Sequence, residues 1–408
     1  MMTISHFMVT LYNVKWGQSS ALGSGFLLQR PIVISLTKVA CHHTAEGMSQ
    51  ASVQETADRK PTVLIVDDEA APRAALTQIL KEDFNILTAK DGRHALAVIN
   101  DRGVDLITLD LKLPDTSGAD ILKEIKRTHR EIEVIMVTAY GSLQSAMDCV
   151  RHGAAGFLLK PFNAGELLSI SLQTSQKKQR LDMLREALAT HEALWQPDPG
   201  CTEAWQALLA RYARQVKSGL LEVSSREVTS PLIQLVSDLL EARDRHLVNH
   251  GNRVSFYATL VGNKLQLPLP EQQHLSLGAL AHDLDLICHD SSPVLHHDST
   301  STQHRPDLGA RIGRAIGLPS EAVQIIALHH ERWDGTGYPF ALKEERIPYL
   351  ARLVSLAQTF DELTADRPGA VPVPFKEALE VIEAQSGTAF DPSLVEVFCR
   401  TIREQPPK

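Results

Sequence analysis

Short apolar runs alternate with amphipathic stretches over residues 61–180, which is the pattern of a sheet whose strands are connected by helices. Five apolar runs predict buried strands at Thr62–Val66, Ile86–Ala89, Asp105–Leu109, Val134–Val137 and Gly156–Leu159. Helical periodicity between them predicts helices over Pro72–Leu80, Gly92–Asn100, Ala119–Thr128 and Leu143–Arg151. Buried strands separated by helices favour a doubly wound α/β domain with a parallel sheet.

The rest of the chain divides into three segments. Residues 1–60 show no coherent core pattern, so we expect them to be disordered or untranslated, with Met48 as the working start. Residues 181–231 predict a helical connector interrupted at Gln196–Gly200, and an active transmitter and a passive spacer both fit this segment. Within residues 232–408, His246 and His250 lie on an apparent helix, and Leu277–Leu286 reads as a buried helix that presents His282 and Asp283.

Composition narrows the class of protein. A chain of 408 residues with 43% hydrophobic residues is sufficient for two to three domains with well-formed cores. The net charge of −8 and the absence of a long basic run argue against direct DNA binding, and no apolar run approaches the length of a membrane span. Five scattered cysteines favour free thiols in a reducing compartment. We therefore expect a cytoplasmic protein.

Chemistry-bearing side chains follow the predicted strands of the first domain. Asp67 and Asp68 follow the first strand, Asp110 the third, Thr138 the fourth and Lys160 the fifth. Because the carboxyl ends of parallel strands meet at one edge of a sheet, these groups should converge there. Clustered carboxylates repel one another unless a hard cation neutralises them, and oxygen ligands suit Mg²⁺.

This arrangement resembles the receiver domain of two-component response regulators, which has a flavodoxin-like fold. The resemblance makes Asp110 the phosphoacceptor and a sensor histidine kinase the partner. It assigns the other residues as follows: Asp67 and Asp68 as the acidic pair, Lys112 as the donor of a backbone carbonyl to Mg²⁺, Thr138 as the switch threonine, Lys160 as the phosphate-binding lysine, and Phe157 as the aromatic switch residue.

A second cluster of chemistry lies in the last region. The adjacent imidazoles His329 and His330 precede a loop broken by glycine and proline that ends at Pro339, while His250 and the pair His282-Asp283 come from separate upstream segments. Nitrogen and carboxylate ligands from separated segments are what a metal centre in a helical bundle needs.

These motifs resemble the HD-GYP family, all-α metal-dependent phosphodiesterases that typically hydrolyse cyclic di-GMP. The resemblance implies Fe, Mn or Zn held by His250, His282, Asp283, His329 and His330, with His246, His304 and Gln358 as further candidates. It implies a substrate loop formed by Asp334, Gly335, Gly337, Tyr338 and Pro339, with Arg367 placed to grip a phosphate.

Several positions depart from the family pattern. Asp285 and Leu286 stand where glycine and a catalytic lysine are expected, and Arg305 stands where a metal-binding histidine is expected, with His304 one place away. Gln358 replaces a carboxylate ligand, which weakens the binding of a divalent cation. Gly369 and Ala370 replace an aromatic and a basic residue of the substrate site.

Three functions therefore stay open. The first is a working cyclic di-GMP phosphodiesterase controlled by phosphorylation of Asp110. The second is a phosphorylation-gated module that binds partner signalling proteins or a nucleotide without turnover, and the third is a phosphohydrolase that acts on another nucleotide. Metal content distinguishes the first two. The oligomeric state, a homodimer included, is also open.

Overall fold

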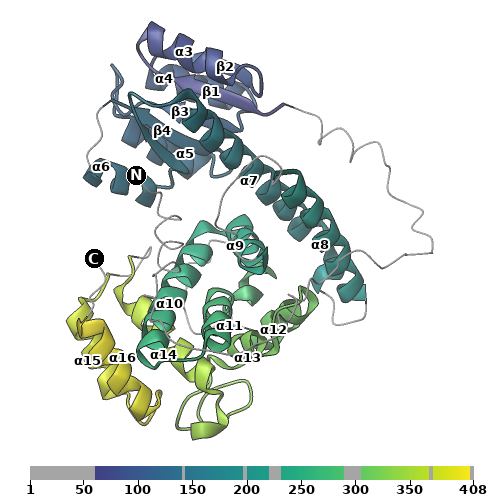
Figure 1. Ribbon diagram of the computed structural model, residues 1–408, viewed down its shortest axis with the longest axis vertical. Helices are drawn as coiled ribbons and strands as arrows, with labels where there is room; N and C mark the ends of the chain where they lie inside the picture. The colour runs from purple at the N-terminus through teal and green to yellow at the C-terminus, as the bar shows by residue number, and fades with distance from the viewer. Residues whose placement is uncertain are drawn as a thin grey trace, which may run out of the picture. The chain divides into compact units, whose positions relative to one another are not determined.

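The computed structural model of the chain describes residues 60–139, 143–195, 200–219, 231–288, 305–366 and 371–404 (Figure 1). A boundary between Ser175 and Gln176 divides the described residues into two compact units. The predictions for residues 1–59, with Met48 as the start, lie outside the described residues, as do those for His304, Arg367, Gly369 and Ala370.

The first unit contains a five-stranded parallel sheet with the strand order β2-β1-β3-β4-β5. The strands are β1 (Thr62–Val66), β2 (Asn85–Ala89), β3 (Leu106–Leu109), β4 (Glu133–Thr138) and β5 (Gly156–Leu159). The helices between them are α3 (Ala70–Leu80), α4 (Gly92–Asp101), α5 (Gly118–Thr128) and α6 (Leu143–Arg151), followed by α7 (Ala164–Thr190). The predicted doubly wound α/β fold is confirmed.

Alternation along the interior strand β1 explains why both faces of the sheet around it are covered. Val63 and Ile65 of β1 pack in one apolar cluster, whereas Leu64 and Val66 pack in a different one. Successive side chains of a strand point to opposite faces, so a strand that is apolar at every position needs helices on both sides. Strands β1, β3 and β4 are accordingly buried along their whole length. The prediction of a buried strand is wrong for β2, which lies at the edge of the sheet and is mostly exposed or half-buried.

The second unit is all helical, as expected for this region. Its described helices are α8 (Gly200–Gly219), α9 (Pro231–Arg243), α10 (Arg245–Lys264), α11 (Leu269–Leu280), α12 (Pro306–Ala315), α13 (Ser320–Leu328), α14 (Tyr349–Thr364), α15 (Phe375–Ala384) and α16 (Pro392–Glu404). Two apolar clusters hold it together, one that joins α8, α9, α12 and α13, and one that joins α10, α14, α15 and α16.

The segment expected to be a connector packs into this second unit. Helix α7 begins in the first unit and continues past the boundary at Gln176. Leu181, Trp205 and Tyr212 are buried in the same apolar cluster as Leu239 of α9. The last turns of α7 and helix α8 are therefore part of the core that supports the metal-binding residues described below.

The prediction that His282 and Asp283 lie within a helix is wrong. Helix α11 ends at Leu280, the pair forms a turn, and a 3₁₀ helix (η3, Leu284–Cys288) follows. The apolar pattern runs unbroken across the turn because η3 is buried as well, so hydrophobicity alone does not reveal the end of the helix.

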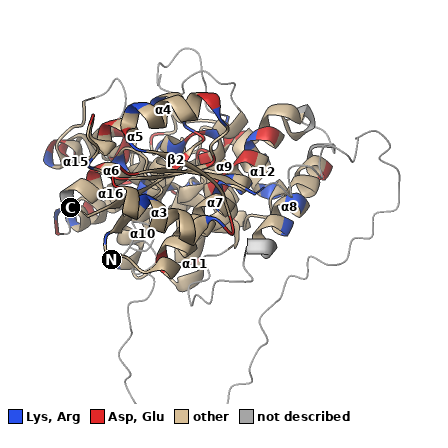
Figure 2. Cartoon of the chain, turned by 90° about the horizontal axis from the view of Figure 1, so that it is seen from above, with Lys and Arg blue, Asp and Glu red and all other residues tan. Residues whose placement is uncertain are grey.

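Acidic and basic residues are both distributed over the helices (Figure 2). Among the described residues, no helix is both long and apolar enough to cross a membrane.

Candidate acidic pocket and histidine metal centre

The acidic pocket of the first unit lies at the carboxyl ends of β1, β3 and β5. Asp67 and Asp110 are buried, and the Lys160 ammonium lies 2.5 Å from Asp67 Oδ2 and 2.7 Å from Asp110 Oδ2. Burial alone would lower the pKa of Lys160, but its hydrogen bonds to Asp110 and Asp67 raise it. The ammonium therefore stays charged and offsets the repulsion between the two carboxylates.

Backbone groups fix the Asp110 carboxylate. The Lys112 N–H donates to Asp110 Oδ1 at 3.2 Å. Helix α5 begins close behind, and a Cβ added at Gly118 would lie 2.0 Å from the Asp110 carbonyl oxygen, so only glycine fits there. The Thr138 side chain is buried at the end of β4, and the Lys160 N–H donates to the Thr138 carbonyl oxygen at 2.8 Å.

The structure thus brings together most of the groups that were predicted to lie at the carboxyl ends of the strands. Asp68 is exposed beside Asp67, and Phe157 is partly buried on β5 against the apolar cluster that contains Leu109. Asp67 and Asp110 with the solvent-facing Asp68 form an oxygen-rich donor set that suits a hard divalent cation.

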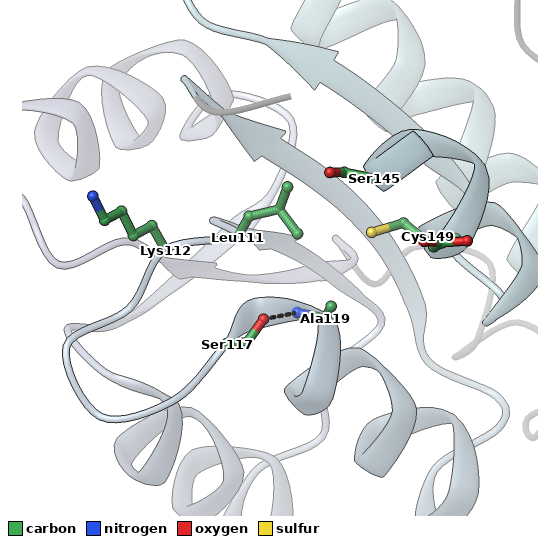
Figure 3. A pocket seen from close by; sticks show the side chains of 7 residues that line it. Leu111, Lys112, Ser117, Ala119, Ser145 and Cys149 are labelled. Atoms are coloured by element: carbon green, nitrogen blue, oxygen red, sulfur yellow. Dashed lines mark hydrogen bonds between the residues drawn. The ribbon is translucent and has the colours of Figure 1, made fainter. Parts of the chain in front are cut away.

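A cavity of about 440 Å³ lies beside this pocket but is separate from it. Its lining comes from the loop after β3, the start of α5, and α6: Leu111, Lys112, Ser117, Ala119, Ser145, Asp148 and Cys149 (Figure 3). The Ser117 hydroxyl accepts from the Ala119 N–H at 3.2 Å and caps α5. None of the three acidic-pocket carboxylates is among the residues that line this cavity, although Lys112 is.

The histidine centre of the second unit draws its donors from three segments. His250 comes from α10, His282 and Asp283 from the turn after α11, and His329 and His330 from the end of α13. Their nitrogen and oxygen atoms form two groups that could hold a metal ion, His250 with His282 and Asp283, and Asp283 with His329 and His330. Asp283 belongs to both groups and can bridge them.

Hydrogen bonds on the far side of each ring determine which nitrogen can bind a metal. His282 Nδ1 donates to the Ala279 carbonyl at 2.7 Å, and His329 Nδ1 donates to the Ile326 carbonyl at 3.0 Å. Carbonyl oxygens only accept, so these Nδ1 atoms carry the proton and the Nε2 atoms carry lone pairs. Ligating histidines in metalloproteins are oriented in the same way.

His250 and His282 present their Nε2 atoms to each other. The two nitrogens are 3.1 Å apart, and Asp283 Oδ2 lies 3.7 Å from the first and 3.4 Å from the second. Two lone pairs at this distance repel each other unless a cation or a shared proton lies between them. The donor chemistry and the neighbouring carboxylate therefore fit a divalent transition metal.

The second group, Asp283 with His329 and His330, lies at the C-terminal end of α13, where the helix dipole favours a cation. His329 caps the C-terminal end of α13, where the helix dipole is negative. His329 Nε2 lies 3.9 Å from Asp283 Oδ1, and the His330 ring stacks on Tyr338 with centroids 4.8 Å apart. Tyr338 is 44% exposed, so part of its ring is accessible to solvent.

Asp361 is a functional residue that the sequence analysis missed. Its carboxylate is fully buried, accepts from His250 Nδ1 at 2.7 Å, and receives two hydrogen bonds from Arg253 at 2.6 and 2.9 Å. Burial would raise the pKa of Asp361, but the hydrogen bonds from His250 and Arg253 lower it. The spacing of His250 and Arg253 was the only signal in the sequence. It places the two side chains on one face of a helix, where a single carboxylate can contact both.

The remaining candidate positions are not among the His, Cys, Asp and Glu donors of the two groups. His246 is exposed on α10, and Arg305 is exposed at the start of α12. Leu286 is buried and apolar, and the Gln358 amide on α14 donates to Glu362 at 3.1 Å. Among the described residues, only the five donors named above form the two groups.

The loop after His330 is held rigidly by its own residues. The buried Glu331 carboxylate accepts from the Phe340 N–H at 2.7 Å and the Leu342 N–H at 2.9 Å. Gly335 has a φ of +81°, and a Cβ at Gly337 would lie 2.3 Å from the Arg332 nitrogen. The two glycines are therefore required by the loop conformation, which holds Tyr338 against His330.

Family models match both units. A response regulator receiver domain model matches residues 63–171, and an HD domain model matches residues 234–394. A receiver domain followed by an HD domain defines a class of response regulators.

The chain is also similar to curated proteins. The chain is 28% identical over 361 residues to a cyclic di-GMP phosphodiesterase of Thermotoga maritima, covering 84% of this chain and 91% of that protein. It is 28% identical to the cyclic di-GMP phosphodiesterase response regulator RpfG of Xanthomonas campestris pv. campestris, covering 87% and 92%. A 3'3'-cGAMP-specific phosphodiesterase of Vibrio cholerae is 30% identical over 186 residues, covering 44% of this chain and 36% of that protein.

The chain therefore combines a response regulator receiver domain with an HD domain, the combination expected from its sequence motifs. The predicted presence of a receiver domain and of an HD domain is confirmed.

Proposed function

We propose that this response regulator accepts a phosphoryl group on Asp110 from a sensor histidine kinase. The Asp110 carboxylate is fixed at the strand edge by the Lys112 N–H and lies 2.7 Å from the Lys160 ammonium. Mg²⁺ bound by Asp67, Asp68, Asp110 and the Lys112 carbonyl would neutralise charge on the incoming phosphoryl group. Asp110 would attack phosphorus, while Lys160 and the Thr138 hydroxyl hold the phosphoryl oxygens.

We further propose that the HD domain hydrolyses a phosphodiester bond of cyclic di-GMP. The observation that carries this proposal is the pair of metal-binding groups joined by Asp283, with the exposed Tyr338 ring beside them. Fe, Mn or Zn held by His250, His282, Asp283, His329 and His330 would supply Lewis-acid chemistry and an activated water. Tyr338 and the rigid loop around it would orient a nucleobase, and Arg367 would pair with a phosphate.

A binding module without turnover is the second candidate. Leu286 replaces the expected lysine with a buried apolar side chain, and Arg305 is exposed rather than ligating. These features remove a cation and an imidazole from the expected catalytic set, which favours binding of a nucleotide or of a partner signalling protein over hydrolysis. The similarity to the 3'3'-cGAMP-specific phosphodiesterase supports a different cyclic dinucleotide as an alternative substrate.

One experiment separates these functions. The full chain is purified without chelator, its Fe, Mn and Zn are measured, and hydrolysis of cyclic di-GMP is followed before and after treatment with acetyl phosphate and Mg²⁺. Stoichiometric metal and turnover that changes on phosphorylation support the enzyme. If the purified protein contains no metal, binds the nucleotide and does not hydrolyse it, the proposal of a binding module replaces that of an enzyme.

Restoring the expected carboxylate tests the metal centre by a gain of function. We expect Gln358→Asp, alone or with Leu286→Lys, to raise metal occupancy and cyclic di-GMP hydrolysis above the wild type. A carboxylate adds a charged ligand where the amide offers a neutral one. Metal analysis and an initial-rate assay measure the effect. Unchanged values, together with rapid wild-type turnover, would show that another residue already provides the missing ligation.

A buried ion pair offers a route by which the receiver could control the HD domain. Arg180 of α7 donates to the buried Asp238 of α9 at 2.8 Å, and the same carboxylate oxygen accepts from the Tyr212 hydroxyl of α8 at 2.7 Å. Because α7 begins in the receiver unit, a movement of this helix would change these bonds directly.

We expect Arg180→Gln to reduce the change in hydrolysis caused by phosphorylation by more than about half, since it removes one partner of a buried ion pair. The matched control is Arg211→Gln, which removes an exposed ion pair with Glu186 and should leave the response unchanged. The ratio of rates with and without acetyl phosphate is the measurement. An unchanged ratio in Arg180→Gln would show that the signal takes another route.

A further inference from the structure

The residue at the missing ligand position has a carboxylate partner that the family pattern does not predict. Gln358 is only 7% exposed, and its Nε2 donates to Glu362 Oε1 at 3.1 Å, one turn further along α14. The intervening Asp361 contacts His250 directly. The face of α14 that carries Gln358, Asp361 and Glu362 is therefore directed toward the histidine centre.

The neighbouring carboxylates have other structural roles. Asp361 orients His250 and pairs with Arg253, and the buried Asp285 accepts from the Arg305 N–H at 2.8 Å at the start of α12. The five donors consist of four imidazoles and one carboxylate, Asp283. Two divalent cations held by such a set need further negative charge close by.

We propose that Glu362 supplies, through Gln358, the negative charge that the metal centre lacks in the absence of an aspartate at position 358. An amide that donates its N–H to a carboxylate is polarised, so its carbonyl oxygen becomes a stronger ligand. Glu362 is in this sense a positioning residue for Gln358. The inference rests on the proposed metal-binding function of the HD domain.

The test is Glu362→Gln in the full chain, because glutamine keeps the size and a carbonyl acceptor for Gln358 but removes the charge. We expect the affinity for Mn²⁺ or Zn²⁺ to fall by roughly 10- to 100-fold, the usual effect of losing a partner of a metal ligand. The melting temperature of the metal-free protein should change little. The matched control, Glu380→Gln on the exposed face of α15, removes the same charge from the HD domain and should bind metal like the wild type.

Two further variants complete the experiment. Glu362→Asp keeps the charge and should retain most of the affinity, and Gln358→Asp combined with Glu362→Gln should restore it, because the charge then comes from position 358. A wild type that binds no metal would overturn the proposed metal function itself. A wild type that binds metal, with equal affinity in Glu362→Gln, would overturn only the role of Glu362. Equal losses in Glu362→Asp and Glu362→Gln would also overturn it, since charge would not be the cause.

Discussion

Asp110→Asn is expected to abolish labelling of the chain by acetyl phosphate in the presence of Mg²⁺. Asparagine matches aspartate in size and can still accept the Lys112 N–H, so the pocket should keep its shape. A neutral amide, however, is not a nucleophile toward phosphorus and does not attract the cation that offsets the phosphoryl charge. Incorporated phosphate, measured by intact mass, should fall to background.

The control for this variant is Asp120→Asn. Asp120 is exposed on α5 and pairs only with the exposed Lys123 among the described residues, so its loss should leave labelling at the wild-type level. Full labelling of Asp110→Asn would mean that another carboxylate accepts the phosphoryl group. Asp67, which shares Lys160 with Asp110, would be the first to examine.

The receiver fold could be predicted from the sequence because its signals are local and agree with one another. The ranges Thr62–Val66, Gly156–Leu159 and Leu143–Arg151 have the predicted bounds, and the other strands and helices differ by one or two residues at their ends. Fully apolar short runs define strands in parallel sheets, and their carboxyl ends then place Asp67, Asp110 and Lys160 together without further information.

The histidine centre was less predictable because its geometry depends on tertiary packing. The sequence indicated His250, His282, Asp283, His329 and His330 through a resemblance, and the structure places these five donors together. It did not indicate Asp361, whose role arises only because α14 packs on α10, or the turn that ends α11 before His282. Helical spacing shows which residues share a face but not which face meets another helix.

The same limit explains the pairing of Gln358 with Glu362. In the sequence, Gln358 is only the loss of a negative charge, because a comparison with the family pattern treats each position separately. In the structure the carboxylate one turn away contacts that amide. The charge lost at one position can therefore be supplied by a residue at another position, and only the contact between the two side chains shows that they are connected.

His282→Ala is expected to lower the metal affinity of the HD domain by more than about 100-fold, beyond the loss typical of an outer partner, because it removes a direct donor. His282 Nε2 lies 3.1 Å from His250 Nε2 and 3.4 Å from Asp283 Oδ2, so it is a central member of its donor group. Hydrolysis of cyclic di-GMP should be lost with the metal.

The matched control is His246→Ala, since His246 is exposed on α10 and belongs to neither metal-binding group. Because His282 is fully buried, its truncation also leaves a cavity, and the melting temperature of each metal-free variant must be measured. A metal that binds only the folded state raises the melting temperature, so wild type and His246→Ala should show this rise and His282→Ala should not. If His282→Ala keeps the full rise, His250 and His282 share a proton rather than a metal, and the centre must be assigned a different chemistry.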